Sequence, residues 1–222
     1  MAVSKTFPAA AVRAAVASGQ RHFGESYAQE AVAKVAAVQA MLAADVESME
    51  SRHPGGGASP QAGPLPGPLV WHFIGPVQSN KTREIAAHFD WVHGVEREKI
   101  ARRLSEQRPD VRSPLNVLIQ VNTSGEASKS GVTPEQVAGL AALVAGLPRL
   151  KLRGLMTIPE PGADPRPRFR VLRALYDELN AQGLTLDTLS MGMSGDFEIA
   201  VTEGATMVRV GSAIFGKRNY EK

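Results

Sequence analysis

The chain has 222 residues, of which 43% are hydrophobic, and it contains no cysteine. This length allows one substantial hydrophobic core and predicts a single domain. The 25 lysine and arginine residues exceed the 22 acidic residues by three, a charge too mild and too dispersed for a nucleic-acid-binding surface. Disulfides and thiolate chemistry are excluded, and no apolar run reaches membrane-spanning length, so we expect a soluble cytoplasmic protein.

In the first half of the chain, short apolar runs alternate with helical patterns. The expected strands are 2–5, 22–25, 70–75 and 91–93, and the expected helices are 8–18, 27–49, a helix that begins at 79–82, and 96–106. Residues 51–69 interrupt this alternation with a run rich in proline and glycine. Such a run cannot bury a core or form a strand ladder, so it predicts a disordered surface insert within the domain.

The second half continues the alternation. The expected strands are 115–121, 152–156, 188–191 and 206–210, and the expected helices are 133–146, 168–181 and 196–202. Thr133, Pro134 and Gln136 combine a capping box with proline at the first helical position, so they predict the first of these helices. Eight strands that alternate with helices, without an obvious hairpin, predict a single α/β domain of the (β/α)8 TIM-barrel type.

Small residues follow the last two expected strands. Ser194 and Gly195 come after the seventh strand, and Gly211 and Ser212 come after the eighth. In barrels of this type a phosphate commonly lies in the loops after these two strands, where glycine lets the backbone approach an anion and serine adds a donor. These residues therefore predict a phosphate site, although ordinary turn chemistry explains the same pattern. Residues 192–196 differ from the Gly-x-Ser-x-Gly elbow, so Ser194 is a poor candidate nucleophile.

Two cations occupy positions that point to a ligand. Arg209 lies on an apolar strand two residues before Gly211, and a buried charge of this kind needs an acceptor from a carboxylate or a ligand. Lys5 ends the first expected strand, where a solvated lysine is the simplest interpretation. Opposite a phosphate site, however, a lysine amine can form a Schiff base with a phosphorylated aldehyde.

The histidines do not indicate a metal. The five of them, His22, His53, His72, His88 and His93, show no metal-ligand spacing. His72 lies inside an apolar strand, which favours a core histidine with satisfied hydrogen bonds over an acid or base. Carboxylates near the strand ends, at positions 25, 126 and 160, show no pairing suited to glycoside chemistry.

Several short sequence blocks follow one another along the chain. The blocks are 2–6 (AVSKT), 23–25 (FGE), 71–76 (WHFIGP) with 78–81 (QSNK), 120–122 (QVN), 128–131 (SKSG), 154–156 (GLM), 189–194 (LSMGMS) and 208–211 (VRVG). In this order they resemble the pyridoxal 5'-phosphate (PLP) homeostasis proteins, which look like the isolated barrel of alanine racemase. The resemblance runs from residue 2 to about residue 216 and is interrupted by the insert.

This resemblance implies a barrel of PLP fold type III without a C-terminal β domain. It implies that Lys5 carries PLP as an internal aldimine, that Ser194, Gly211 and Ser212 hold the phosphate, and that Arg209 faces the pyridine nitrogen. A permanent cation beside that nitrogen weakens the ring as an electron sink. We therefore expect a monomeric carrier that buffers PLP, or delivers it to apo-enzymes, without appreciable turnover.

The sequence departs from the family pattern at two further places, and two alternatives stay open. The chain begins almost at the lysine strand, which suggests a truncated or misassigned start, and Ser26 stands where the family commonly has asparagine. One alternative is a PLP-dependent amino-acid racemase with weak activity. The other is a phosphosugar enzyme, which is disfavoured because no acid and base pair is evident.

Overall fold

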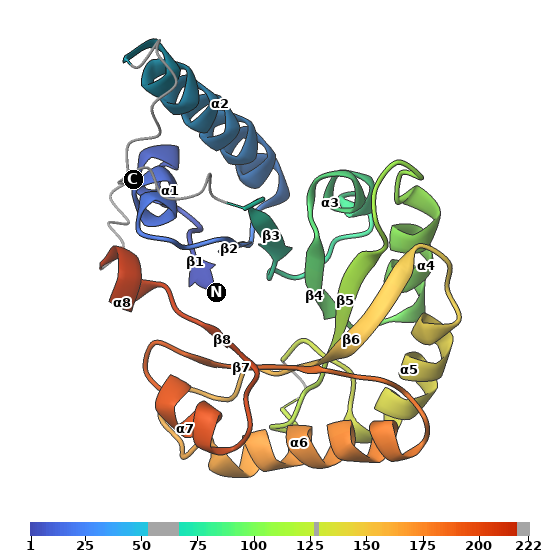
Figure 1. Ribbon diagram of the computed structural model, residues 1–222. Helices are drawn as coiled ribbons and strands as arrows, with labels where there is room; N and C mark the ends of the chain where they lie inside the picture. The colour runs from blue at the N-terminus through green and yellow to red at the C-terminus, as the bar shows by residue number, and fades with distance from the viewer. Residues whose placement is uncertain (53–66, 127–128, 217–222) are drawn as a thin grey trace.

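The computed structural model describes residues 1–52, 67–126 and 129–216, and in this part of the chain eight parallel strands form one closed sheet (Figure 1). The strands follow one another around the barrel in sequence order. They are β1 (Ala2–Val3), β2 (His22–Glu25), β3 (Val70–Phe73), β4 (Trp91–Val95), β5 (Leu115–Gln120), β6 (Leu150–Met156), β7 (Thr188–Met193) and β8 (Met207–Arg209).

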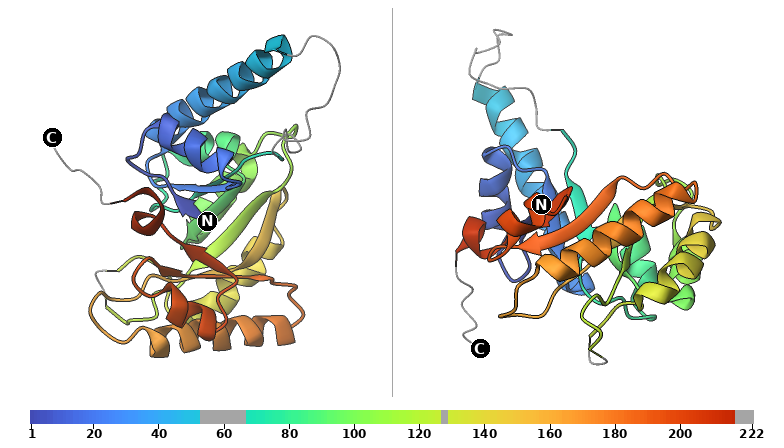
Figure 2. Two further views of the ribbon diagram at one scale, coloured as in Figure 1. Left: turned by 60° about the vertical axis from the view of Figure 1, so that its left-hand side comes forward. Right: turned by 90° about the horizontal axis from the view of Figure 1, so that it is seen from below.

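Helices connect the strands and lie outside the ring (Figures 1 and 2). The long helix α2 projects beyond the body of the barrel in both figures. The helices are α1 (Ala9–Ala17), α2 (Ala28–Arg52), α3 (Thr82–His88), α4 (Glu98–Gln107), the 3-10 turn η1 (Pro134–Gln136), α5 (Val137–Ala145), α6 (Arg166–Ala181), α7 (Phe197–Thr202) and α8 (Ser212–Phe215). The capping box predicted at Thr133 and Gln136 is confirmed.

The barrel closes between its first and last strands. Ala2 forms a parallel bridge with Val210, and the Val3 amide donates to the Val210 carbonyl at 2.8 Å. The Val210 amide in turn donates to the Met1 carbonyl at 3.1 Å. The segments around the first and last strands thus form the seam of the barrel. The predicted eight-stranded barrel is confirmed.

Most of the apolar core lies between the strands and the helices around them. The continuous apolar sequence of β5 is buried on both faces, as expected for a parallel strand covered by helices. The helix α4 buries Ile100, Ala101 and Leu104 on one side, because these positions share a face at helical spacing. A smaller cluster consists of Trp91, Leu118 and Met156.

Glycine at position 154 allows β6 and β7 to pair closely. Its φ is +155°, and a Cβ atom built there would lie 1.8 Å from the Thr188 carbonyl oxygen. No other residue fits this backbone without moving the neighbouring strand. The sequence block at 154–156 therefore has a packing role in addition to any role at the site.

Three expectations change in detail. The first strand ends at Val3, so Lys5 lies in the turn that follows it and not on the strand itself. Helix α2 continues to Arg52, three residues beyond the predicted end, and the short helix α8 was not predicted. Residues 53–66, most of the predicted insert, lie outside the described residues. Within the described ranges, every helix is too short or too polar to cross a membrane.

Candidate functional site

A pocket of about 460 Å³ opens at the end of the barrel where the strands finish. All five residues predicted to bind the cofactor line it, namely Lys5, Ser194, Arg209, Gly211 and Ser212. The other described residues that line it are Val3, Ser26, Ile74, Ile158, Met193 and Gly195. Because these residues follow different strands, closure of the barrel is what brings them together.

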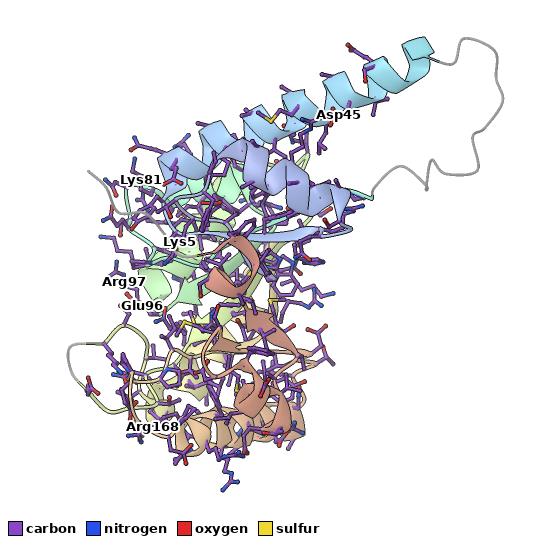
Figure 3. All side chains as sticks on the ribbon, turned by 90° about the vertical axis from the view of Figure 1, so that its left-hand side faces the viewer. Lys5, Asp45, Lys81, Glu96, Arg97 and Arg168 are labelled. Carbon is purple, nitrogen blue, oxygen red and sulfur yellow. The ribbon has the colours of Figure 1, made fainter. Side chains whose placement is uncertain are left out.

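Lys5 reaches this pocket from the turn after β1. Figure 3 shows it near α8 and away from Asp45, which lies on α2. The aromatic rings of Phe7 and Phe215 lie 5.0 Å apart and join this turn to α8. Thr6 has a φ of 69°, and its amide donates to Glu30 at 3.0 Å. These contacts hold the turn on the C-terminal side of the lysine.

A buried ion pair supports the backbone directly before Lys5. The Lys34 ammonium donates to Glu25 Oε1 and to the Ser4 carbonyl, both at 2.8 Å. The Ser4 hydroxyl donates to the same Glu25 oxygen at 2.6 Å. Burial raises the pKa of Glu25, although the hydrogen bonds from Lys34 and Ser4 oppose that rise. These contacts hold the backbone of Ser4 in place, and so they position the turn from which Lys5 enters the pocket.

The loop after β7 contacts the loop after β8 through a serine. The Gly211 amide donates to the Ser194 hydroxyl at 3.3 Å, and the Met193 amide donates to Asp196 at 2.5 Å. Gly195 also lines the pocket, and a Cβ atom built there would meet no atom within 4 Å. The two loops thus present hydroxyl and backbone donors, with little side-chain bulk, to one part of the pocket.

Arg209 enters the pocket from β8 as a buried cation. Its side chain donates to the Ser190 carbonyl at 2.8 Å, to the Ser190 hydroxyl at 2.8 Å, and to the Thr157 carbonyl at 2.9 Å. All three acceptors are neutral, and no carboxylate among the described residues forms an ion pair with Arg209. Burial lowers the pKa of Arg209 to about 10, so the side chain remains charged at neutral pH.

The atoms that Arg209 leaves for a ligand fit the expected cofactor. Its three hydrogen bonds use Nη1 and Nη2, and within the described part of the chain Nε donates to no protein acceptor. A ring nitrogen with a lone pair is a suitable acceptor for such a donor. Together with the amine of Lys5 and the hydroxyl groups of Ser194 and Ser212, this donor set suits a phosphorylated pyridine aldehyde.

Ser26, noted as a departure from the family pattern, lines the pocket beside Ile74. The loop that carries it passes close to the loop after β3. A Cβ atom at Gly75 would lie 2.4 Å from the Ser26 carbonyl oxygen, so glycine is needed there for the loops to approach. The sequence signal for this contact is the glycine of the WHFIGP block.

The remaining candidates do not form a second chemical site. The described residues contain no cluster of three or more potential metal ligands. Glu160 pairs with Arg168 at 2.8 Å rather than with another carboxylate. His72 is fully buried and hydrogen-bonded, so its predicted role as a satisfied core histidine is confirmed.

Comparison with known proteins first gives the class of the barrel. The model of the alanine racemase N-terminal domain matches residues 1–219. The solved alanine racemase of Clostridium difficile 630 superposes with a TM-score of 0.68 at 12% identity, over 99% of this chain and 52% of that chain. This likeness shows the fold alone, and it agrees with the predicted racemase-like barrel.

Closer relatives give the family. The chain is 55% identical over 220 residues to the pyridoxal phosphate homeostasis protein of Pseudomonas aeruginosa, covering 99% of this chain and 84% of that protein. It is 47% identical over 225 residues to the protein of the same name from Escherichia coli K12, covering 100% of this chain and 86% of that protein. The chain therefore belongs to the pyridoxal phosphate homeostasis protein family, as the sequence blocks predicted.

Solved structures of one relative agree with this assignment. PipY of Synechococcus elongatus PCC7942, in the structure without PLP, superposes with a TM-score of 0.79 at 38% identity, over 97% of this chain and 91% of that chain. The structure of PipY with PLP bound gives a TM-score of 0.76 over the same shares of the two chains. A barrel of this kind therefore holds PLP in a relative.

Proposed function

We propose that this protein binds PLP through a covalent bond to Lys5 and maintains the cytoplasmic PLP supply without appreciable turnover. The observation that carries the proposal is the meeting of Lys5, Arg209 and the two serine-containing loops in one pocket. The family membership and the PLP-bound structure of PipY support it.

Each pocket residue has a separate task in this proposal. The Lys5 amine forms a C=N bond with the aldehyde carbon of PLP, and one water molecule leaves. Ser194 and Ser212 donate hydrogen bonds to the phosphate, and Gly211 lets the backbone approach it closely. The Arg209 side chain donates to the pyridine nitrogen, and its positive charge disfavours protonation of that atom. Bound PLP would supply an electron-withdrawing ring, and a ring nitrogen without a proton makes that ring a weaker electron sink.

The chemistry of the pocket favours a carrier over the racemase alternative. Racemisation removes a proton from one face of a carbon and returns one to the other face, so it needs two opposed acid-base groups. Among the described residues that line the pocket, only Lys5 and Arg209 are titratable, and Arg209 is fixed to three protein acceptors. We therefore expect binding and release, without efficient proton exchange at a substrate.

Borohydride reduction of the protein with PLP, followed by peptide mass mapping, tests the attachment. We expect one phosphopyridoxyl adduct, on Lys5, and no site-specific adduct in Lys5→Ala. The matched control is Lys99→Ala, because Lys99 is exposed on α4 and does not line the pocket. An adduct retained in folded Lys5→Ala would contradict the proposal. Solvent deuterium uptake at Cα of alanine, at a rate comparable with that of a racemase, would support the alternative.

Delivery to apo-enzymes is the second part of the proposal. The loaded protein should reactivate an apo PLP-dependent enzyme in the presence of a scavenger that removes free PLP. Reactivation that disappears when the scavenger is added would indicate simple release into solution. Light scattering of the loaded protein alone should give the mass of one chain, because all the described residues that line the pocket come from a single copy.

A further inference from the structure

Three histidines form a line of hydrogen bonds through the barrel, outside the pocket described above. His22 Nδ1 lies 3.0 Å from His72 Nε2, and His72 Nδ1 lies 3.0 Å from His93 Nε2. His93 Nδ1 then lies 3.0 Å from the Ser190 hydroxyl, which accepts a hydrogen bond from Arg209 at 2.8 Å. The line thus ends on the side chain that faces the pocket.

The stagger of the strands explains why these side chains meet. His22 on β2 is level with Val70 on β3, and His72 lies two residues further along that strand. His72 is level with Trp91 on β4, and His93 again lies two residues further. Side chains two residues apart on a strand share a face, so each histidine lies one step closer to the pocket end of the barrel than the previous one.

The line of histidines runs from the protein surface to its buried interior. His22 is exposed, whereas His72, His93 and Ser190 are completely buried. Burial holds the pKa of His72 and of His93 well below 6.5, and the positive charge of Arg209 further lowers the pKa of His93. Both buried imidazoles are therefore neutral at physiological pH, and each carries one proton.

The hydrogen bonds allow one direction that leaves no donor unused. The Ser190 oxygen already accepts from Arg209, so its own O–H is available to donate to His93 Nδ1. The His93 proton then lies on Nε2 and is donated to His72 Nδ1. By the same rule the His72 proton lies on Nε2 and is donated to His22 Nδ1. In the opposite direction, the O–H of Ser190 would have no acceptor among the described residues.

We propose that His22, His72, His93 and Ser190 form a one-way hydrogen-bond chain of neutral imidazoles that positions the Arg209 guanidinium for its ligand. They are positioning residues, because they act through Arg209 and do not line the pocket themselves. The chain explains how a buried cation is held with neutral partners and without a carboxylate. For its effect on the ligand, this inference rests on the proposed PLP function.

The direction can be measured in the protein without any ligand. Long-range nitrogen–proton correlation spectra of protein labelled with 15N-histidine report which ring nitrogen carries the proton. At pH 7 we expect His72 and His93 to be neutral and protonated on Nε2. A proton on Nδ1 of either residue, or a charged imidazole at either position, would overturn the proposal. Because PLP is absent, this result does not depend on the proposed function.

The second measurement breaks the link to Arg209. In Ser190→Ala, the Nδ1 resonance of His93 should move toward that of a nitrogen without a hydrogen bond, and PLP should bind about tenfold more weakly. Ser190→Thr keeps the hydroxyl and should restore both properties. The matched control is His88→Ala, because His88 is exposed on α3 and does not belong to the hydrogen-bond chain of His22, His72 and His93. It should change neither property.

The outcomes separate the two proposals. Unchanged PLP affinity in folded Ser190→Ala would overturn the positioning role even where the unaltered protein binds PLP on Lys5. Failure of the unaltered protein to form an adduct on Lys5 would overturn the proposed function and leave the tautomer result valid. If Ser190→Ala does not fold, the spectra of the unaltered protein still decide the direction of the chain.

Discussion

Two buried cations lie near the pocket, and the protein holds them in opposite ways. Lys34 pairs with the buried carboxylate of Glu25 at 2.8 Å, so its charge is balanced within the protein. Arg209 is held by two carbonyl groups and a hydroxyl group, and that hydroxyl leads to neutral histidines. Burial lowers the pKa of Arg209 and the charge of Asp196 opposes that shift without an ion pair between them, so among the described residues Arg209 has no paired carboxylate where a ligand enters the pocket.

This difference matches the positions of the two residues. Lys34 lies behind the turn that carries Lys5, and its hydrogen bond to the Ser4 carbonyl fixes the backbone. Arg209 lines the pocket itself. A balanced charge supports the fold, whereas an unbalanced charge is costly to bury and is useful when a ligand accepts from it. The following experiments break or sharpen this comparison, from the largest expected effect to the smallest.

Removal of the carboxylate partner should have the largest effect. In Glu25→Gln the buried Lys34 ammonium keeps only its contact with Glu30 at 3.0 Å, a carboxylate that is 38% exposed, and we expect a loss of about 3 kcal/mol in the free energy of unfolding. Urea denaturation measures this loss. Adding Lys34→Met removes the stranded charge and should recover most of the stability. A loss below about 1 kcal/mol in the single variant would show that the pair is not a structural requirement.

The buried neutral histidines, which lead to Arg209 through Ser190, should make the fold sensitive to acid. The pKa values of His72 and His93 are lower in the folded chain than the unfolded value of 6.5. Below pH 6.5 the unfolded chain therefore binds more protons, and stability that is complete above this pH is lost as the pH falls. For two histidines the loss approaches about 2.7 kcal/mol per pH unit.

The free energy of unfolding of the unaltered protein and of His93→Gln, measured between pH 7.5 and 5.5, checks this prediction. The slope should be roughly halved in the variant. Glu25 contributes with the opposite sign, because its pKa is raised in the folded chain and its protonation on acidification favours folding. Since both proteins retain Glu25, the difference between their slopes isolates the histidine. Equal slopes would contradict the prediction.

Replacement of Arg209 by lysine should lower the affinity for PLP more than it lowers the stability of the fold. Lysine keeps the charge but not the planar group that reaches Ser190, Thr157 and the pocket together. We expect PLP to bind about tenfold more weakly in Arg209→Lys, measured by absorbance titration, while reduction still labels Lys5. Unchanged affinity would mean that charge alone, without geometry, is sufficient.

An exposed ion pair provides the baseline. Arg153 contacts Asp187 at 2.6 Å, and the side chains of the two residues are 22% and 53% exposed. Asp187→Asn should lower the free energy of unfolding by less than about 1 kcal/mol, with a smaller loss at high salt. A thermal unfolding series at two salt concentrations measures this change. A loss comparable with that of Glu25→Gln would remove the distinction between buried and exposed pairs.

Local patterns predicted the barrel well because each strand and helix carries its own signal. Apolar runs such as 115–121 and the capping box at Thr133 act over a few residues. The pocket residues Lys5 and Arg209 could also be predicted, because the ends of successive parallel strands meet at one end of a barrel.

The supporting contacts could not be predicted in the same way. The histidine line depends on a two-residue stagger between neighbouring strands, which no single strand sequence encodes. The pairing of Glu25 with Lys34 depends on how α2 returns over β2, so the spacing of nine residues gave no signal. Lys5 was expected on a strand, but the ladder stops at Val3 and the chain turns there.

The seam of the barrel gives the pocket a mechanical meaning. The turn carrying Lys5 follows β1, and Arg209 ends β8, so a ligand bound to both joins the first strand to the last across the bridge between Ala2 and Val210. Such a ligand links the two strands, because the barrel cannot open between β1 and β8 without breaking the ligand's contact with Lys5 or with Arg209. At a ligand concentration one hundred times the dissociation constant, binding adds about 2.7 kcal/mol to the stability of the closed barrel. Ligand binding and barrel closure are thus linked in one equilibrium, and we expect the barrel to open more readily when the pocket is empty.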